Sequence, residues 1–184
     1  MYLLRHGQSY FNLHFNATQI DPGIEDPQLT PLGARQAAAA AERLAAAGLT
    51  RIIVSPYTRA LQTAAPIIAR HRVPVHVSPE VRERAAYACD IGSPPHELAS
   101  RFPDHDFAHL PHRWWHPGVE PVEETAGRAR AFRAQMAARD DHATTLVVSH
   151  WGFILALTGI SAGNGELLHY DPKSEPPGVI DWDA

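Results

Sequence analysis

Four residues near the start of the chain, Leu4-Arg5-His6-Gly7, directly follow a short apolar stretch and combine a permanent cation with an imidazole. Arginine offers a planar fork of donors that fits the oxygens of a phosphate, and a neighbouring glycine lets the backbone approach a ligand closely. An imidazole at this point can act as a nucleophile toward phosphorus. Such chemistry requires further cationic donors and a group that gives and takes a proton.

The pattern of apolar residues and turn formers predicts alternating strands and helices. Thr30 is expected to cap the first helix, with Pro31 at its first helical position. Residues 6–28 resemble a loop, and 167–170 and 179–182 are expected as edge strands. Strands are expected at 2–4, 51–55, 73–77 and 144–149, and helices at 33–47, 58–71, 96–102, 123–139 and 152–157.

Strands that alternate with helices predict an α/β fold, a three-layer α/β/α sandwich around a mainly parallel sheet. Ligands of such sheets bind beyond the carboxyl ends of the strands. His6 follows the first predicted strand, Arg59 lies just after the second, and His150 follows the strand at 144–149. We therefore expect these three side chains to converge at one edge of the sheet.

The length of 184 residues predicts a single domain, residues 1–184, with residues 81–122 as an irregular, insertion-like excursion. The pair Trp114-Trp115 in this excursion is expected to pack in the interior, with a place in the roof of a pocket as the alternative. The single cysteine, Cys89, cannot form an internal disulfide, which favours a reducing, cytoplasmic location and an inert side chain.

Charge and hydropathy exclude several classes of partner. A formal net charge of -4 argues against a nucleic-acid-binding protein, which normally carries a basic stripe. No apolar run is long enough to span a membrane, and the N-terminus does not resemble a signal peptide. The twelve histidines lack the spacing of metal-ligand motifs, so no metal site is predicted.

Four motifs occur in order along the chain, each at the end or the start of a predicted element. They are Arg5-His6-Gly7-Gln8-Ser9 with Asn12, Leu29-Thr30-Pro31-Leu32-Gly33-Ala34-Arg35-Gln36-Ala37, Ser55-Pro56-Tyr57-Thr58-Arg59-Ala60-Leu61-Gln62-Thr63-Ala64 and Ser149-His150-Trp151-Gly152. Together they resemble the motifs of the histidine phosphatase superfamily, which also contains the cofactor-dependent phosphoglycerate mutases. The resemblance covers nearly the whole chain and implies a phosphoglycerate mutase-like fold.

The resemblance also implies roles for individual residues. His6 would attack phosphorus in line and form a phosphohistidine. Arg5, Arg59 and His150 would surround the transferring group and stabilise the charge on its oxygens, so that neither a metal nor another cofactor is required. Asn12 would donate to a phosphate oxygen.

A carboxyl group must protonate the leaving alkoxide and later deprotonate the attacking water. The resemblance places this role on Glu83, shortly after the third predicted strand, with Glu80 as the nearest competitor. After Glu83 the chain departs from the usual pattern of the family at residues 87–94, which leaves Asp90 as another candidate. Arg84 would bind the remainder of the substrate.

The function implied by the resemblance is a metal-independent phosphatase that hydrolyses a phosphomonoester of a small molecule, with a phosphoprotein as the other substrate class. Two alternatives stay open. Phosphoglycerate mutase-type phosphoryl transfer in the family goes with a longer chain that carries an inserted capping segment. A non-catalytic phosphate-binding module would share the fold but lack a correctly placed proton donor. The sequence indicates no oligomeric state.

Overall fold

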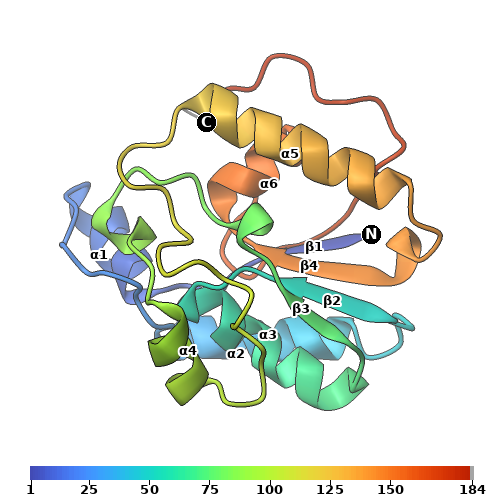
Figure 1. Ribbon diagram of the computed structural model, residues 1–184, viewed down its shortest axis with the longest axis horizontal. Helices are drawn as coiled ribbons and strands as arrows, with labels where there is room; N and C mark the ends of the chain where they lie inside the picture. Colours follow the sequence, from blue (N-terminus) through green and yellow to red (C-terminus); the bar gives the residue numbers. More distant parts are fainter. Residues whose placement is uncertain (183–184) are drawn as a thin grey trace.

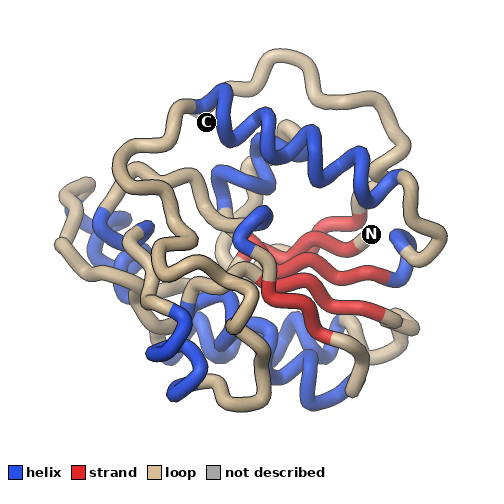
Figure 2. Tube along the Cα trace, viewed as in Figure 1, coloured by secondary structure: helices blue, strands red, loops and turns tan. Residues whose placement is uncertain are grey.

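A five-stranded sheet forms the middle layer of the protein, in a computed structural model that describes residues 1–182 (Figures 1 and 2). Its strands are β1 (Tyr2–Arg5), β2 (Arg51–Val54), β3 (Val75–Val77), β4 (Thr145–Ser149) and β5 (Leu167–His169). They lie in the order β3-β2-β4-β1-β5, and only β5 runs antiparallel to its neighbour. The predicted, mainly parallel sheet is therefore confirmed.

Helices cover both faces of this sheet. The helices are α1 (Tyr10–Thr18), α2 (Pro31–Arg43), α3 (Thr58–His71), α4 (Pro95–Arg101), α5 (Val122–Ala137) and α6 (Trp151–Thr158), together with the 3-10 turns η1 (Pro79–Val81), η2 (Ala88–Asp90) and η3 (His142–Thr144). In Figure 1, α2 and α3 lie on one side of the sheet, and α5 and α6 lie on the other. The three-layer α/β/α sandwich is confirmed.

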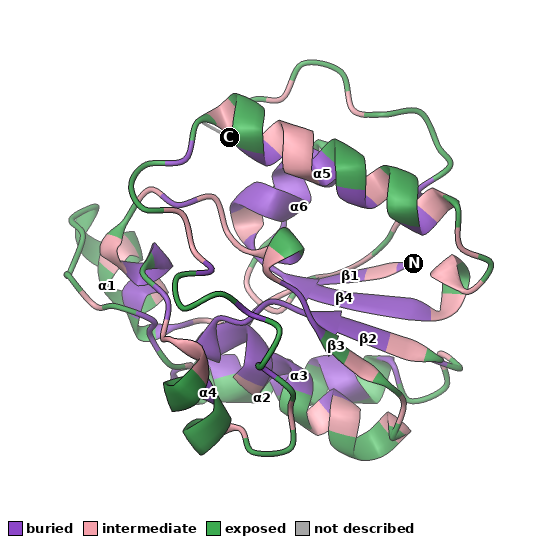
Figure 3. Cartoon of the chain, in the orientation of Figure 1, coloured by how far each residue is buried: buried purple, intermediate pink, exposed green. Residues whose placement is uncertain are grey.

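The sheet supplies apolar side chains to both helix layers because successive residues of a strand point to opposite faces. Leu4 and Val148 pack into the cluster with α2 and α3, whereas Leu3 and Val147 pack into the cluster with α5 and α6. β4 is buried along its whole length (Figure 3). Each fully buried aliphatic side chain stabilises the fold by about 1.5–3 kcal/mol, so this central strand is a well-anchored base for the residues that follow it.

α2 begins where the sequence predicts it. The Thr30 hydroxyl accepts a 3.1 Å hydrogen bond from the Gly33 backbone N–H, and Pro31 occupies the first turn, where its missing N–H costs nothing. The helix ends at Arg43, four residues before the predicted end. Leu44 and Leu49 are both buried, so the chain turns back to the core between them in spite of the helix-favouring alanines.

The expectation of a loop over residues 6–28 is wrong, because α1 lies within it. Ser9 and Asn12 form a capping box: the Asn12 N–H donates to the Ser9 hydroxyl at 3.3 Å, and the Ser9 N–H donates to Asn12 Oδ1 at 3.0 Å. Phe11 is the only buried residue of the helix, so its sequence shows little apolar periodicity. The Ser-x-x-Asn spacing of the capping box was the sequence signal that could have predicted this helix.

Two further expectations for strands need correction. β3 covers residues 75–77 rather than 73–77. Residues 179–182 form no strand; Ile180 and Trp182 instead pack against the α5 and α6 cluster. None of the helices within residues 1–182 is both long enough and apolar enough to cross a membrane.

Candidate active site

The parallel register brings the two motif histidines together at the carboxyl ends of the central strands. Arg5 in β1 is paired with Ser149 in β4, and the His6 N–H donates to the Ser149 carbonyl at 3.0 Å. The rings of His6 and His150 have centroids 5.0 Å apart. Residues 144 positions apart in the sequence thus become neighbours, as the topology predicts.

His6 is held in one tautomer. Its Nδ1 lies 2.7 Å from the Gly7 carbonyl oxygen. Because a carbonyl oxygen can only accept, Nδ1 carries the proton and the lone pair is on Nε2. Burial, followed by the charges of Arg59 and Arg5, holds the pKa of His6 well below its ordinary value. The ring is therefore neutral near pH 7, the state that a nucleophile requires.

His150 occupies the N-cap position of α6 and is fully buried. Its Nε2 lies 2.7 Å from the Ser55 hydroxyl, which follows β2. Burial, then the nearby charges of Arg59, His6 and Arg5, holds the pKa of His150 well below its ordinary value. Its Nδ1 is buried without a hydrogen-bond partner among the described residues.

Arg5 carries the second buried nitrogen without a hydrogen-bond partner at this edge of the sheet. Its Nη1 donates to the Ala162 carbonyl at 2.7 Å, whereas its Nε is buried and has no partner among the described residues. A buried polar group without a partner costs about 1–3 kcal/mol, so each of these two nitrogens is a candidate to bind a ligand atom.

Arg59 is the second buried cation of the site, and a carboxylate holds it in place. Its Nη1 donates to the Cys89 carbonyl at 2.7 Å and its Nη2 to Asp90 Oδ1 at 3.1 Å. The other oxygen of Asp90 accepts the backbone N–H groups of Ala86 and Tyr87. Both oxygens of Asp90 are thus committed to the turn and to Arg59, which favours a positioning role for this residue over proton donation.

Glu83 lies over the first turn of α6. Its Oε1 accepts the backbone N–H groups of Gly152 and Arg84, both at 2.8 Å. A Cβ at Gly152 would come within 2.6 Å of this oxygen, so a glycine is needed there. Burial, and then the neighbouring charge of Asp90, raises the pKa of Glu83 to about 7. A carboxyl group with this pKa can donate a proton and take one back at neutral pH.

The backbone that carries Glu83 is fixed by a buried carboxylate that the sequence did not single out. Glu120 binds Arg82 Nη2 at 2.8 Å, and it binds Arg128 through both of its oxygens. Arg128 in turn donates to the carbonyl groups of Glu80 and Arg82 at 2.8 Å. This network joins α5 to residues 80–84, so Glu120 positions Glu83 without touching it.

Replacing Glu120 by alanine is expected to lower the free energy of unfolding by about 3–5 kcal/mol, because two partly buried arginines lose their shared counter-charge. Urea denaturation measures the change. Glu123→Ala, at an exposed position in the first turn of α5, is the matched control and should lose no more than about 1 kcal/mol. Equal urea midpoints for the two variants would show that the network is not a stabilising one.

Asn12 and Arg84 both line the cavity that contains His6 and Glu83. Asn12 Oδ1 accepts from Ser9 and, at 3.2 Å, from Asn164, so its amide nitrogen is the group that can meet a ligand. The Arg84 guanidinium donates through Nε to the Glu120 carbonyl at 3.0 Å and lies 5.5 Å from the centre of the Trp182 ring.

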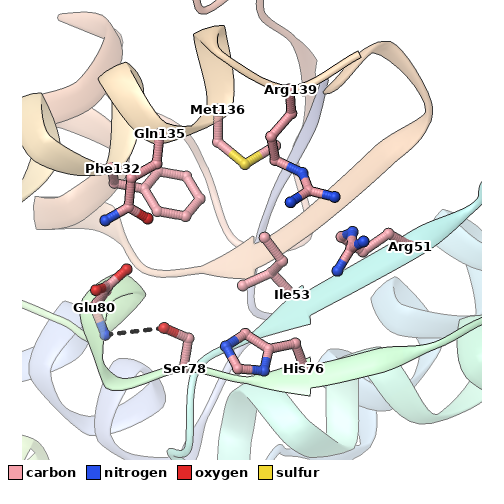
Figure 4. A pocket seen from close by; sticks show the side chains of 9 residues that line it. All are labelled: Arg51, Ile53, His76, Ser78, Glu80, Phe132, Gln135, Met136 and Arg139. Carbon is pink, nitrogen blue, oxygen red and sulfur yellow. Dashed lines mark hydrogen bonds between the residues drawn. The ribbon is translucent and has the colours of Figure 1, made fainter. Parts of the chain in front are cut away.

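Glu80 lies in a different cavity. Figure 4 shows this cavity of about 480 Å³ between the sheet and α5, where Glu80 lies beside Ser78 and faces the side chains of α5. Arg51 and His76 line the same cavity. His6 does not, so the structure brings Glu83 and not Glu80 to the histidine pair.

Trp114 and Trp115 lie outside the cavity of His6. Trp114 is buried, donates from its indole to the Ser93 carbonyl at 2.9 Å and packs edge-on against Tyr57, while Trp115 packs against Trp114. Cys89 is also buried, and burial raises the pKa of its thiol well above the usual range, which disfavours the thiolate.

The cavity of His6 has a volume of about 570 Å³ and a partly aromatic lining. Five aromatic side chains line it, of which none was predicted from the sequence to do so: Phe11, Phe15, Tyr87, Trp151 and Trp182. Phe11 and Phe15 come from the missed helix α1, whose capping signal could have revealed them. No sequence signal pointed to Trp182. Among the described residues, no group of three or more His, Cys, Asp or Glu side chains could hold a metal ion.

Comparison with known proteins gives related phosphatases along most of the chain. The chain is 31% identical to the "Uncharacterized phosphatase PhoE" of Bacillus subtilis (strain 168), over 90% of this chain and 79% of that protein. A shorter stretch, 45% of this chain and 37% of the relative, is 42% identical to the "Probable phosphoglycerate mutase GpmB" of Proteus mirabilis (strain HI4320).

Among solved structures, the mycobacterial glucosyl-3-phosphoglycerate phosphatase Rv2419c with bound VO3 superposes with a TM-score of 0.61 and 26% identity, over 91% of this chain and 88% of that chain. The profile of the histidine phosphatase superfamily (branch 1) matches residues 1–170. With its two histidines and two arginines at the carboxyl ends of parallel strands, this chain belongs to the histidine phosphatase superfamily.

Proposed function

We propose that the protein is a phosphatase that hydrolyses phosphomonoesters of small molecules through a phosphohistidine on His6, without a metal. One observation carries the proposal: the proton of His6 is fixed on Nδ1 by the Gly7 carbonyl, which leaves a neutral Nε2 beside Arg5, Arg59 and His150. The membership of the superfamily and the likeness to phosphatases support the same reaction class.

In the first step, His6 Nε2 attacks phosphorus, the P–N bond forms and the bond to the leaving oxygen breaks. Protonated Glu83 gives its proton to that oxygen, and an alcohol departs. Negative charge on the phosphoryl oxygens is stabilised by Arg5 and Arg59, which line the cavity of His6, and by the Nδ1 of His150, whose ring lies 5.0 Å from that of His6.

In the second step, ionised Glu83 takes a proton from water, the water oxygen attacks phosphorus, and the P–N bond breaks. Inorganic phosphate leaves, and His6 and Glu83 return to their starting states. The pKa of Glu83 of about 7 suits both directions of transfer. A mutase would instead return the phosphoryl group to a second alcohol, and the partial likeness to a probable phosphoglycerate mutase makes this the second candidate.

Labelled phosphate trapped on the protein tests the proposal. Incubation with a ³²P-labelled phosphomonoester and a quench should give an adduct that is labile in acid and stable in base, as a phosphoramidate is. Hydrolysis of 4-nitrophenyl phosphate should continue at the same rate in excess chelator. Activity that disappears with the chelator contradicts the metal-free reaction, and binding of phosphate without any turnover points to a non-catalytic module. Transfer to added 2-phosphoglycerate faster than hydrolysis would favour the mutase.

A further inference from the structure

The cavity of His6 is lined in part by aromatic rings that the proposed reaction does not use. They form two groups. Phe11, Phe15 and Tyr87 lie with ring centroids 5.0–5.5 Å apart, and the first two are stacked. Trp151 and Trp182 meet edge to face at 6.5 Å. We call these five residues the aromatic rim.

One member of the aromatic rim comes from outside the family domain. The superfamily profile matches residues 1–170, whereas Trp182 lies on the segment that follows. Ile180 and Trp182 pack against the α5 and α6 cluster, and this packing brings the Trp182 ring to Trp151 at the start of α6. The segment 171–182 thus completes a wall of the cavity that the family domain itself does not supply.

The charges of the cavity indicate what this wall accepts. Its lining cations, among the described residues, are Arg5, Arg59 and Arg84. The first two lie beside the histidines, where the phosphate is expected. Arg84 is already engaged with the Glu120 carbonyl and lies against Trp182. Beyond the phosphate, the cavity therefore offers aromatic faces and the neutral amides of Asn16 and Gln19, with Arg84 as the one further cation among its described lining residues.

We propose that the aromatic rim selects phosphomonoesters whose alcohol carries a flat ring, and that Trp182 is a specificity-determining residue. The inference rests on the proposed phosphatase reaction for its catalytic step. Flat rings gain both area burial and favourable edge or face contacts against aromatic side chains.

A matched pair of esters tests the selection. 2-Phenylethyl phosphate and ethyl phosphate are both esters of primary alcohols, so their leaving groups are chemically alike and differ in the ring. We expect kcat/KM to be roughly 10- to 100-fold higher for the phenylethyl ester, the gain from burying one aromatic side group. Equal kcat/KM values for the two esters would overturn the inference.

Binding of phosphonates separates this inference from the proposed reaction. 3-Phenylpropylphosphonate and propylphosphonate have a CH₂ group in place of the ester oxygen and cannot be hydrolysed. Calorimetry on the wild-type protein should show that the phenyl compound binds more tightly by a similar ratio. If the esters are not hydrolysed but this ratio holds, the phosphatase reaction fails and the specificity of the cavity stands. If the esters are hydrolysed but the two phosphonates bind equally tightly, the inference fails. It also fails if neither phosphonate binds.

Trp182→Ala should reduce the preference for the phenylethyl ester by about fivefold to tenfold, because the ring loses one wall. Its kcat/KM for the phenylethyl ester should fall by more than its kcat/KM for ethyl phosphate does. Trp182→Phe should recover most of the preference, since an aromatic face returns. Val179→Ala, at a fully exposed position of the same segment, is the control and should change neither value. An unchanged preference in Trp182→Ala would remove Trp182 from the site.

Discussion

His6→Ala is expected to lower kcat for phosphomonoester hydrolysis by about 10⁴-fold or more and to abolish the acid-labile phosphoprotein. The imidazole supplies a buried neutral nitrogen lone pair near Arg5 and Arg59, and its removal takes away the proposed nucleophile that splits the displacement into two steps. Steady-state kinetics with 4-nitrophenyl phosphate and trapping of labelled phosphate measure the two effects.

A histidine outside the site provides the control. His96 lies exposed in α4, and His96→Ala should keep both the rate and the adduct. Binding of inorganic phosphate to His6→Ala should persist, because Arg5, Arg59 and His150 stay in place. A phosphoprotein that survives the loss of His6 would move the nucleophile to another residue.

Glu83→Gln is expected to lower kcat/KM for alkyl phosphates by about 10²–10⁴-fold, the usual contribution of a general acid. An amide of the same shape preserves the packing but cannot release a proton to the leaving alkoxide. 4-Nitrophenyl phosphate has a leaving group that departs without help, so its phosphorylation step should slow much less. Single-turnover kinetics on both esters give the comparison. Equal slowing of both would show that Glu83 is not the proton donor.

The pH dependence follows from the raised pKa of Glu83, about 7. Below this value the carboxyl group is mostly protonated and can act as the acid. As the pH rises above about 7, the acid form is lost, and kcat/KM for an alkyl phosphate should fall about tenfold per pH unit. Glu83→Gln should lack this fall. Both proteins are measured on the same ester, so the ionisation of the substrate affects the two pH profiles equally and drops out of their comparison.

Glu80 and Asp90 are the natural comparisons for Glu83. Glu80→Gln lies in the separate cavity beside α5 and should leave the rate and the pH profile unchanged (Figure 4). Asp90→Asn weakens the hold on Arg59 and should slow the nitrophenyl ester as well as alkyl esters, because it affects phosphate binding. It also removes a charge that raises the pKa of Glu83, so the fall of kcat/KM for an alkyl ester should begin at a lower pH. If Asp90→Asn instead slowed alkyl esters alone and abolished this fall, Asp90 would be the acid.

The fold was predictable because local signals and global topology agree. Apolar strands such as β4, the Thr30-Pro31 start of α2 and the alternation of strands with helices all indicate the same sandwich. α1 was missed because its helix is stabilised by the Ser9 and Asn12 capping box, while most of its surface is exposed. Polar turn-forming residues that cap a helix are hard to distinguish from those of a loop.

Within the candidate site, the residues that follow strand ends were predictable and the supporting ones were not. His6 and His150 follow β1 and β4, whose pairing the parallel topology dictates. Glu120 is separated in sequence from Arg82 by 38 residues and from Arg128 by 8. No periodic pattern in the sequence indicates that these side chains are in contact. The network depends on how residues 80–84 dock on α5, which is a tertiary property.

By itself, the sequence determined the strand–helix alternation and the identity of the groups that follow each strand. Those depend on local periodicity and on backbone chirality, which are written into neighbouring residues. Only the tertiary structure decided which carboxylate lines the cavity of His6, which carboxylate holds Arg59, and which rings line the same cavity. These choices are contacts between segments distant in sequence, because Asp90 meets Arg59, and Trp182 meets Trp151, only after the chain has packed. The motif Arg5-His6-Gly7 therefore indicates the class of reaction, while the folded cavity supplies the proposed proton donor and the rings proposed to meet the substrate.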